Sequence, residues 1–219
     1  MTYAILLLCA FCLEVTLNLP VGSLPLALES EGCTREQIAM AMGSGMFTAL
    51  IVSIPIGALV DRIGRLATMR LAVLASFITM GALTFLHGAL WAAVLMALRS
   101  ISLCAFMTAE FAYGSTIVPK ERAISATATM GIIGNFCFAI APAMAVYLWQ
   151  KGCLREQYLW AEIFIVVGAL LLTKLPEKHD MKITSASKKR IMMRRTWVPA
   201  ILFATSCALQ GGVAWVDGD

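Results

Sequence analysis

Stretches of about 20 apolar residues recur along this 219-residue chain and constrain its fold more than any other feature. A helix of that length spans the hydrocarbon core of a bilayer, where every backbone polar group must be hydrogen-bonded within the element. With 60% apolar and 14% charged residues, the composition excludes a water-soluble domain. The 13 Met and 16 Gly fit closely packed helices better than the alternating pattern of a membrane barrel, so we expect an all-α polytopic membrane protein.

The apolar stretches predict a series of transmembrane segments. They lie near residues 4–28, 36–60, 67–88, 90–113, 122–149, 156–175 and 197–216. Short connectors make the successive helices antiparallel neighbours. The residues after the sixth segment differ, because they hold seven Lys and Arg and few apolar side chains. We therefore expect a six-helix transmembrane domain over 1–175, a basic linker over 176–196, and a seventh helix that starts a second bundle over 197–219.

Lys and Arg are distributed unequally between the two sides of these segments. Thirteen lie on the side of the second and fourth connectors and the basic linker, and three lie on the other side. By the positive-inside rule, this places the N-terminus and the linker in the cytoplasm, and we expect a cell membrane such as the bacterial inner membrane. The basic stretch 188–195 has a second interpretation, a nucleic-acid patch, but its place beside a span favours anionic lipid. We expect no nucleic-acid partner.

One connector carries a specific motif. Residues 57–65 read GALVDRIGR and resemble the G-x-L-x-D-R-x-G-R loop of the major facilitator superfamily at every fixed position. The resemblance implies two bundles of six helices, each bundle built from two inverted three-helix repeats, with this chain covering the first bundle. It also implies secondary active transport of small molecules by alternating access, in which this loop latches the two bundles together.

The residues of this loop have physical reasons for their places. Gly57 lets two helices approach closely, and Gly64 can take the positive φ that a short reversal needs. Asp61 can accept hydrogen bonds from helix N-terminal N–H groups, and Arg65 can donate to carbonyls or carboxylates. With Arg62, they form the expected conformational latch. The alternative is a loop that only holds two helices together on the correct side.

Weaker motifs favour the proton-coupled exporter branch of this family. Arg99 is similar to the start of its R-x-x-Q-G motif, with Ser102 and Leu103 in place of Gln and Gly. Residues 139–143, AIAPA, resemble its Gly-Pro motif with Ala for Gly. The resemblance implies efflux driven by protons, whereas the altered motifs leave open an uptake carrier for a sugar, organic acid or other metabolite. A third alternative is a non-transporting product or assembly partner.

Ionisable residues inside the predicted spans are the main candidates for function, because a charge at a helix centre costs roughly 2.5–3.5 kcal/mol on insertion scales. Counting about 1.5 Å per residue puts Glu14 and Arg99 at nearly the same depth. The resemblance places their helices beside the central cavity. We expect an ion pair that weakens when Glu14 takes up a proton, which would couple proton entry to the orientation of the bundle. A purely structural ion pair is the alternative.

Two further polar residues are candidates to line the cavity. Glu110 follows Arg99 by eleven residues and returns to nearly the same helix face, but it is also a candidate partner for Arg65 or Arg70. Asn135 can donate to substrate or to a neighbouring helix. No metal-ligand cluster, nucleophilic triad or cofactor motif can be assembled from the sequence, so we expect no cofactor and no enzymatic activity.

The motifs account for one of the two bundles that alternating access requires. The sequence therefore predicts an incomplete half-transporter that does not transport alone. Its expected partners are a small-molecule substrate, protons, membrane lipid, and either the missing C-terminal half or a second copy of itself.

Overall fold

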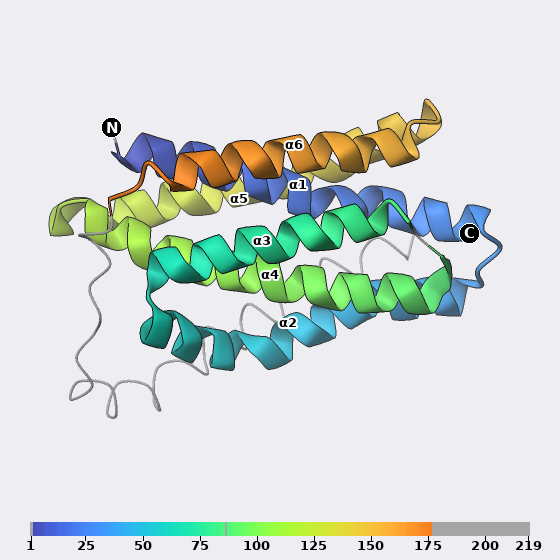
Figure 1. Cartoon of the computed structure of the whole chain (residues 1–219), viewed down its shortest axis with the longest axis horizontal. Helices are drawn as coiled ribbons and strands as arrows, with labels where there is room; N and C mark the ends of the chain where they lie inside the picture. The colour runs from blue at the N-terminus through green and yellow to red at the C-terminus, as the bar shows by residue number, and fades with distance from the viewer. Residues whose placement is uncertain (1, 86, 177–219) are drawn as a thin grey trace.

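The structure, a computed structural model, describes residues 2–85 and 87–176 and consists of long helices (Figure 1). They are α1 (Thr2–Ser30), α2 (Arg35–Ile63), α3 (Arg65–Leu83), α4 (Gly88–Ile117), the 3-10 turn η1 (Lys120–Arg122), α5 (Ala123–Gln150) and α6 (Leu154–Leu172). These α-helices coincide with the first six predicted segments. The third ends at Leu83, earlier than the predicted residue 88. The basic linker and the seventh segment lie outside the described residues.

A capping box and a glycine define the two ends of α2. At its start, Gln37 N donates to Thr34 Oγ1 at 3.4 Å, and Thr34 N donates to Gln37 Oε1 at 2.9 Å. At its end, Gly64 has φ 98° and ψ 159°, a region that is essentially restricted to glycine. The chain therefore reverses at Gly64 and continues directly into α3, and the predicted positive φ is confirmed.

The helices pack as two groups of three. Figure 1 shows α1, α5 and α6 on one side of the molecule and α2, α3 and α4 on the other. α1 packs along α5 and α6, α4 packs along α2 and α3, and α1 meets α4 between the groups. Exchanging α1–α3 with α4–α6 leaves this pattern of contacts unchanged. Two inverted three-helix repeats produce this relation.

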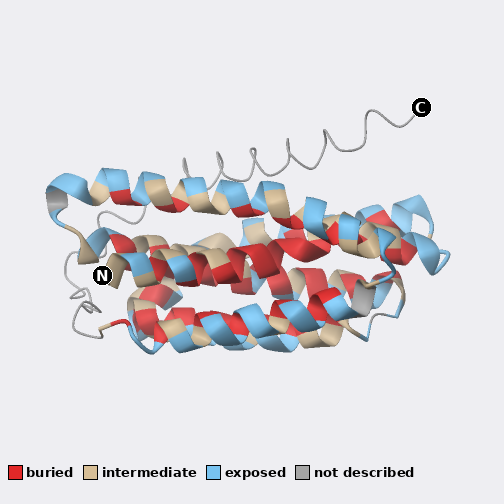
Figure 2. Cartoon of the chain, turned by 90° about the horizontal axis from the view of Figure 1, so that it is seen from above, coloured by how far each residue is buried: buried red, intermediate tan, exposed pale blue. Residues whose placement is uncertain are grey.

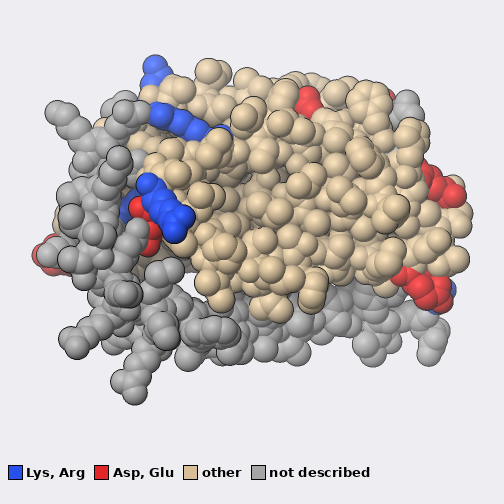
Figure 3. All heavy atoms as spheres, turned by 60° about the horizontal axis from the view of Figure 1, so that its bottom comes forward, with Lys and Arg blue, Asp and Glu red and all other residues tan. Residues whose placement is uncertain are grey.

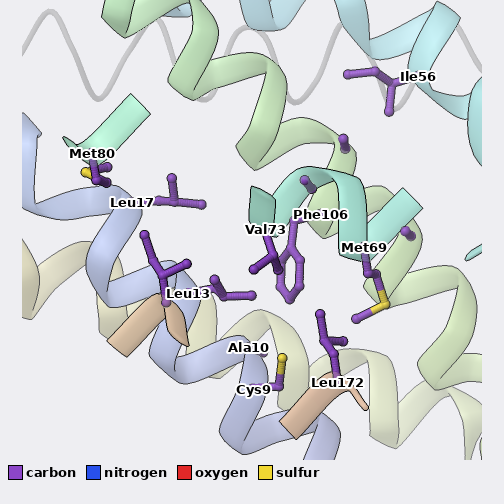
Figure 4. Packing of buried hydrophobic residues seen from close by; sticks show 14 of the residues in the cluster. Cys9, Ala10, Leu13, Leu17, Ile56, Met69, Val73, Met80, Phe106 and Leu172 are labelled. Atoms are coloured by element: carbon purple, nitrogen blue, oxygen red, sulfur yellow. The ribbon is translucent and has the colours of Figure 1, made fainter. Parts of the chain in front are cut away.

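The interior where α1, α3, α4 and α6 meet is apolar (Figure 4). Cys9 and Leu13 of α1, Val73 of α3, Phe106 of α4 and Leu172 of α6 are all buried in one cluster. Lipid tails are as apolar as these side chains, so leaving lipid contributes little to helix association. The bundle therefore depends on close packing between the helices.

Small residues lie where the helices approach most closely. A Cβ atom added at Gly22 of α1 would be 2.3 Å from the carbonyl oxygen of Pro142 in α5. A Cβ atom added at Gly45 of α2 would be 2.9 Å from the hydroxyl of Ser100 in α4. Larger side chains at Gly22 or Gly45 would push their helices apart, so these positions set the spacing of the pairs α1–α5 and α2–α4.

The outer surface is that of a membrane protein. Exposed residues run along the outside of the helices (Figure 2), and on the face in Figure 3 a broad middle band carries few charged side chains. The helices α1 to α5 are long and apolar enough to cross a membrane. α6 is not among them. Its 19 residues include three charged side chains, Arg155, Glu156 and Glu162, which lower its apolar character.

Candidate functional site

Arg99 joins α4 to α1 in the middle of the bundle. It is only 5% exposed, and its Nε donates to the carbonyl oxygen of Leu17. Its Nη2 donates to Asn18 Oδ1 at 3.1 Å. A guanidinium has no acceptor of its own and needs acceptors around it inside a membrane. Here neutral oxygens of α1 supply two of them.

Asn18 is in turn fixed by its own helix. Its side-chain nitrogen donates to the carbonyl oxygen of Glu14, one turn earlier, at 2.8 Å. This bond orients the amide so that its oxygen faces Arg99. The contact between α1 and α4 therefore depends on the Asn18 amide, whose nitrogen is bonded to α1 and whose oxygen is bonded to Arg99.

Glu14 faces α5 instead of Arg99. Its side chain is 2% exposed, and a Cβ atom added at Gly134 of α5 would lie 2.7 Å from Glu14 Oε2. The structure therefore does not form the expected ion pair between Glu14 and Arg99. The two residues do lie at similar depth, because Arg99 contacts Leu17 and Asn18, within one turn of Glu14. The carboxylate is directed to Gly134 of α5, while Asn18, one turn later in α1, accepts the hydrogen bond from Arg99.

Glu110 lies deeper in the bundle, on α4. Its side chain is 0% exposed, and neither carboxylate oxygen has a hydrogen-bond partner among the described residues. Arg65, one of its two expected partners, donates instead to Thr116 Oγ1 at 2.9 Å. The structure thus gives Glu110 no hydrogen bond to Arg65 or Arg70.

The loop at 57–65 forms the tight link between α2 and α3. Gly64 N donates to Val60 O at 3.0 Å, and Thr68 N donates to Gly64 O at 3.1 Å, so the glycine ends one helix and starts the next. Arg62 is exposed, and Asp61 and Arg65 are partly exposed beside it. Gly57 was expected at a close contact between two helices. Among the described residues there is no such contact, because a Cβ atom added at Gly57 would have no atom within 4 Å.

Asn135 lies on α5 next to Gly134 but is exposed. Its side chain makes no hydrogen bond to another described residue, so the expected helix-to-helix bond is not formed there. The cavity-lining interpretation of Asn135 stays a prediction.

Sequence reasoning missed three residues of this interior. Asn18 orients Arg99, Gly134 seats the Glu14 carboxylate, and Gln157 of α6 is 1% exposed with neither amide atom hydrogen-bonded to a described residue. The spacing of Glu14 and Asn18, four residues apart, was a signal for one helix face. No comparable signal marks Gln157, because a charged stretch surrounds it in the sequence.

Known proteins resemble this chain in sequence and in fold. A family model described as Major Facilitator Superfamily matches residues 6–216. The multi-drug resistance efflux pump PmrA of two Streptococcus pneumoniae strains is 27% identical over 167 residues, which covers 74% of this chain and 41% of PmrA. The crystal structure of the human organic anion transporter MFSD10 (TETRAN) matches with a TM-score of 0.67 and 16% identity, over 80% of this chain and 47% of that chain.

This chain spans less than half the length of the relatives it matches. At 16% identity, the likeness to MFSD10 shows the fold alone. The family model, in contrast, covers almost the whole sequence, and the motif at 57–65 lies at a reversal between two apolar helices of the described bundle. The chain therefore belongs to the Major Facilitator Superfamily of membrane transporters.

Proposed function

We propose that this chain forms the first bundle of a proton-coupled exporter of small, mostly apolar compounds. The main observation is the placement of Glu14. This carboxyl is almost completely buried in the middle of a transmembrane helix, against a glycine of α5, and it has no ion pair with Arg99. A buried ionisable side chain in a membrane is costly and is typically retained for ion or substrate handling.

The bundle supplies a second element of this mechanism. Arg99 holds a fixed positive charge one turn from Glu14, bound to Asn18 and to the Leu17 carbonyl. When Glu14 loses its proton, the opposite charges attract across the interior, and when it gains a proton, that attraction is lost. The orientation of the bundle that brings Glu14 and Arg99 closer is therefore favoured when Glu14 is deprotonated. A proton moving down a potential of 100 mV supplies about 2.3 kcal/mol per charge.

The direction of transport is proposed from sequence. PmrA is an efflux pump by its name, and 27% identity over 167 residues supports export over uptake. The expected latch at 57–65 and the exposed Asn135, expected to line the cavity, belong to the same proposal. Glu110, the other expected cavity residue, is enclosed in the bundle. Alternating access also needs a second bundle, with the substrate site between the two. The N-terminus is proposed to face the cytoplasm, in agreement with the distribution of Lys and Arg.

Transport in inside-out vesicles tests this function. A two-bundle transporter containing this chain is expected to move a fluorescent lipophilic dye into vesicles with an acidic lumen, and a protonophore is expected to stop this movement. Glu14→Gln is expected to abolish the dependence on the gradient, since its side chain cannot titrate. The matched control is Glu162→Gln, at a partly buried carboxyl of α6.

Two results would contradict the proposal. Dye movement that is indifferent to the pH gradient would exclude proton coupling. Movement of dye and protons in the same direction would indicate an uptake carrier. The chain without a second bundle is expected to show no transport in the same assay.

A further inference from the structure

Glu110 is the most deeply buried carboxyl in the described part of the chain. Its side chain is 0% exposed, compared with 2% for Glu14 and partial exposure for Glu162. Both oxygens lack a hydrogen-bond partner among the described residues. Burying an ionised carboxylate without partners is far more costly than burying a neutral one. The geometry therefore fits a carboxyl that carries a proton in this conformation.

Packing does not account for the choice of glutamate at this position. Leucine or methionine fills a similar volume in the same helix without a polar group to desolvate, and such replacements of buried charged residues are often neutral or stabilising. Neighbouring buried positions of α4, Phe106 and Ala109, are indeed apolar. An acid in this environment is expected to serve proton or ion handling.

The titratable groups coupled electrostatically to Glu110 lie on α1 and α5. Glu14 is the charged residue that acts on it. Tyr3 and Cys9 of α1 and Cys137 of α5 also lie within its electrostatic reach, and all three are ordinarily neutral side chains. From α3, Arg65 reaches Thr116, and neither Arg65 nor Arg70 hydrogen-bonds Glu110. Within the described residues, neither oxygen of Glu110 receives a hydrogen bond from a cation.

Helix register gives the relation between the two acids. α1 and α4 are antiparallel, and Arg99 is level with Leu17 and Asn18. Counting eleven residues from Arg99 makes Glu110 about level with the second turn of α1. One turn further along α4, a Cβ atom added at Gly114 would lie 3.3 Å from Leu6 Cδ2. Glu14 is therefore about 10 Å from Glu110 along the axis, at about 1.5 Å per residue. Along the bundle, Arg99 comes first, then Glu14, then Glu110. Beyond Glu110 is the end of the bundle that holds the α2–α3 reversal at Gly64, here called the Gly64 end.

We propose that Glu110 is a second proton-binding carboxyl of the transport cycle, located between Glu14 and the Gly64 end of the bundle, and that the two acids are not both ionised in this conformation. This inference rests on the proposed function, because it assigns the path of the driving ion. Glu110 takes up or releases its proton at the Gly64 end, and its charge state controls how readily Glu14 ionises. The bundle then binds protons at two coupled positions.

Infrared difference spectroscopy on the purified chain in lipid nanodiscs tests the proposal without transport. A protonated carboxyl in an apolar site has a C=O band separate from those of ionised and solvated carboxylates. Because Glu14 can contribute a band of its own, the Glu110 component is identified by difference. In wild type this component is expected to disappear as the pH is raised, it is expected to be missing in Glu110→Gln, and in Glu110→Asp it is expected to return at a shifted frequency. Glu162→Gln is the matched control and is expected to keep the band.

The coupling between the acids has its own readout. In Glu14→Gln, the midpoint of the Glu110 band is expected to move to lower pH by up to about one unit, which is the effect of one like charge at a separation of about 10 Å and an effective dielectric constant of about 20. The midpoint moves down because the Glu14 charge no longer opposes ionisation of Glu110.

Several outcomes would overturn the proposal. A carboxyl band that does not change with pH shows a permanently neutral structural residue, and an undiminished band in folded Glu110→Gln shows that another acid titrates. If Glu110→Gln fails to fold, the Glu110→Asp spectrum decides, since an unshifted band contradicts the assignment. A titrating Glu110 band together with failed dye export would leave this proton site standing and reject the exporter function, so the two failures are distinguishable.

Discussion

The Arg99 guanidinium donates to Asn18 Oδ1 over 3.1 Å, and this hydrogen bond joins the two helices at the centre of the bundle. Asn18 is buried as well, with 5% of its surface exposed. The positive charge is therefore held by a neutral amide and a backbone carbonyl of α1.

Removing this amide is expected to destabilise the bundle. Asn18→Ala leaves a buried guanidinium without one of its acceptors, and a hydrogen bond to a charged group contributes about 1.5–3 kcal/mol. We expect a loss of that size in the free energy of unfolding, measured in detergent by circular dichroism during titration with sodium dodecyl sulfate. The control is Asn135→Ala, at an exposed amide, which is expected to change stability little. Equal stability of the two variants would contradict a structural role for Asn18.

The crossing of α1 and α5 is expected to tolerate no side chain at Gly22. In Gly22→Ala, the added methyl group meets the Pro142 carbonyl at 2.3 Å, so the helices must separate. Overpacking of this kind costs typically about 1–3 kcal/mol. Thermal unfolding in detergent measures the loss.

Gly131→Ala is the matched control for this substitution. Gly131 lies in α5, and an added Cβ atom meets nothing within 4 Å. Alanine has the higher helix propensity, so this variant is expected to be as stable as the parent or more stable by up to about 1 kcal/mol. If Gly131→Ala lowers stability as much as Gly22→Ala does, steric conflict is not the cause.

Hydropathy predicted the positions of the helices well. The first six segments coincide with helices because lipid requires every backbone group to be bonded within a helix, so long apolar stretches have little alternative. The reversal at Gly64 was predicted for a similar reason, since only glycine readily adopts its dihedral angles. α6 coincides with the sixth predicted segment, but it is not among the helices apolar enough to cross a membrane, because Arg155, Glu156 and Glu162 interrupt its apolar pattern.

The site was predicted less completely than the fold. Counting residues placed Glu14 and Arg99 at one depth, since the rise per residue of a helix is constant. It did not show that Glu14 points to Gly134, because the rotation of a helix about its axis depends on packing against its neighbours. Gly57 was expected at a close contact and has none among the described residues.

The reversal between α2 and α3 is expected to require glycine at position 64. Gly64→Ala forces a side chain into a region with φ 98°, and strain of this type costs about 1–3 kcal/mol. The measurement is the free energy of unfolding in detergent. Gly57→Ala is the control, since this glycine is helical and an added Cβ atom meets nothing within 4 Å. A loss in Gly57→Ala equal to that in Gly64→Ala would show that backbone strain is not responsible.

The orientation in the membrane is expected to follow the distribution of Lys and Arg. Cys33 and Cys153 lie in the turns after α1 and α5, both partly exposed, and Arg62 is exposed at the other end of the bundle. In single-cysteine variants, a membrane-impermeant maleimide added to intact cells is expected to label Cys33 and Cys153 but not Arg62→Cys. Permeabilised cells are expected to show labelling at all three positions, which controls for reactivity. The side that contains Arg62 carries thirteen Lys and Arg, and the side that contains Cys33 and Cys153 carries three. The positive-inside rule therefore places position 62 in the cytoplasm. Labelling of position 62 in intact cells would reverse the proposed topology and place the Gly64 loop outside.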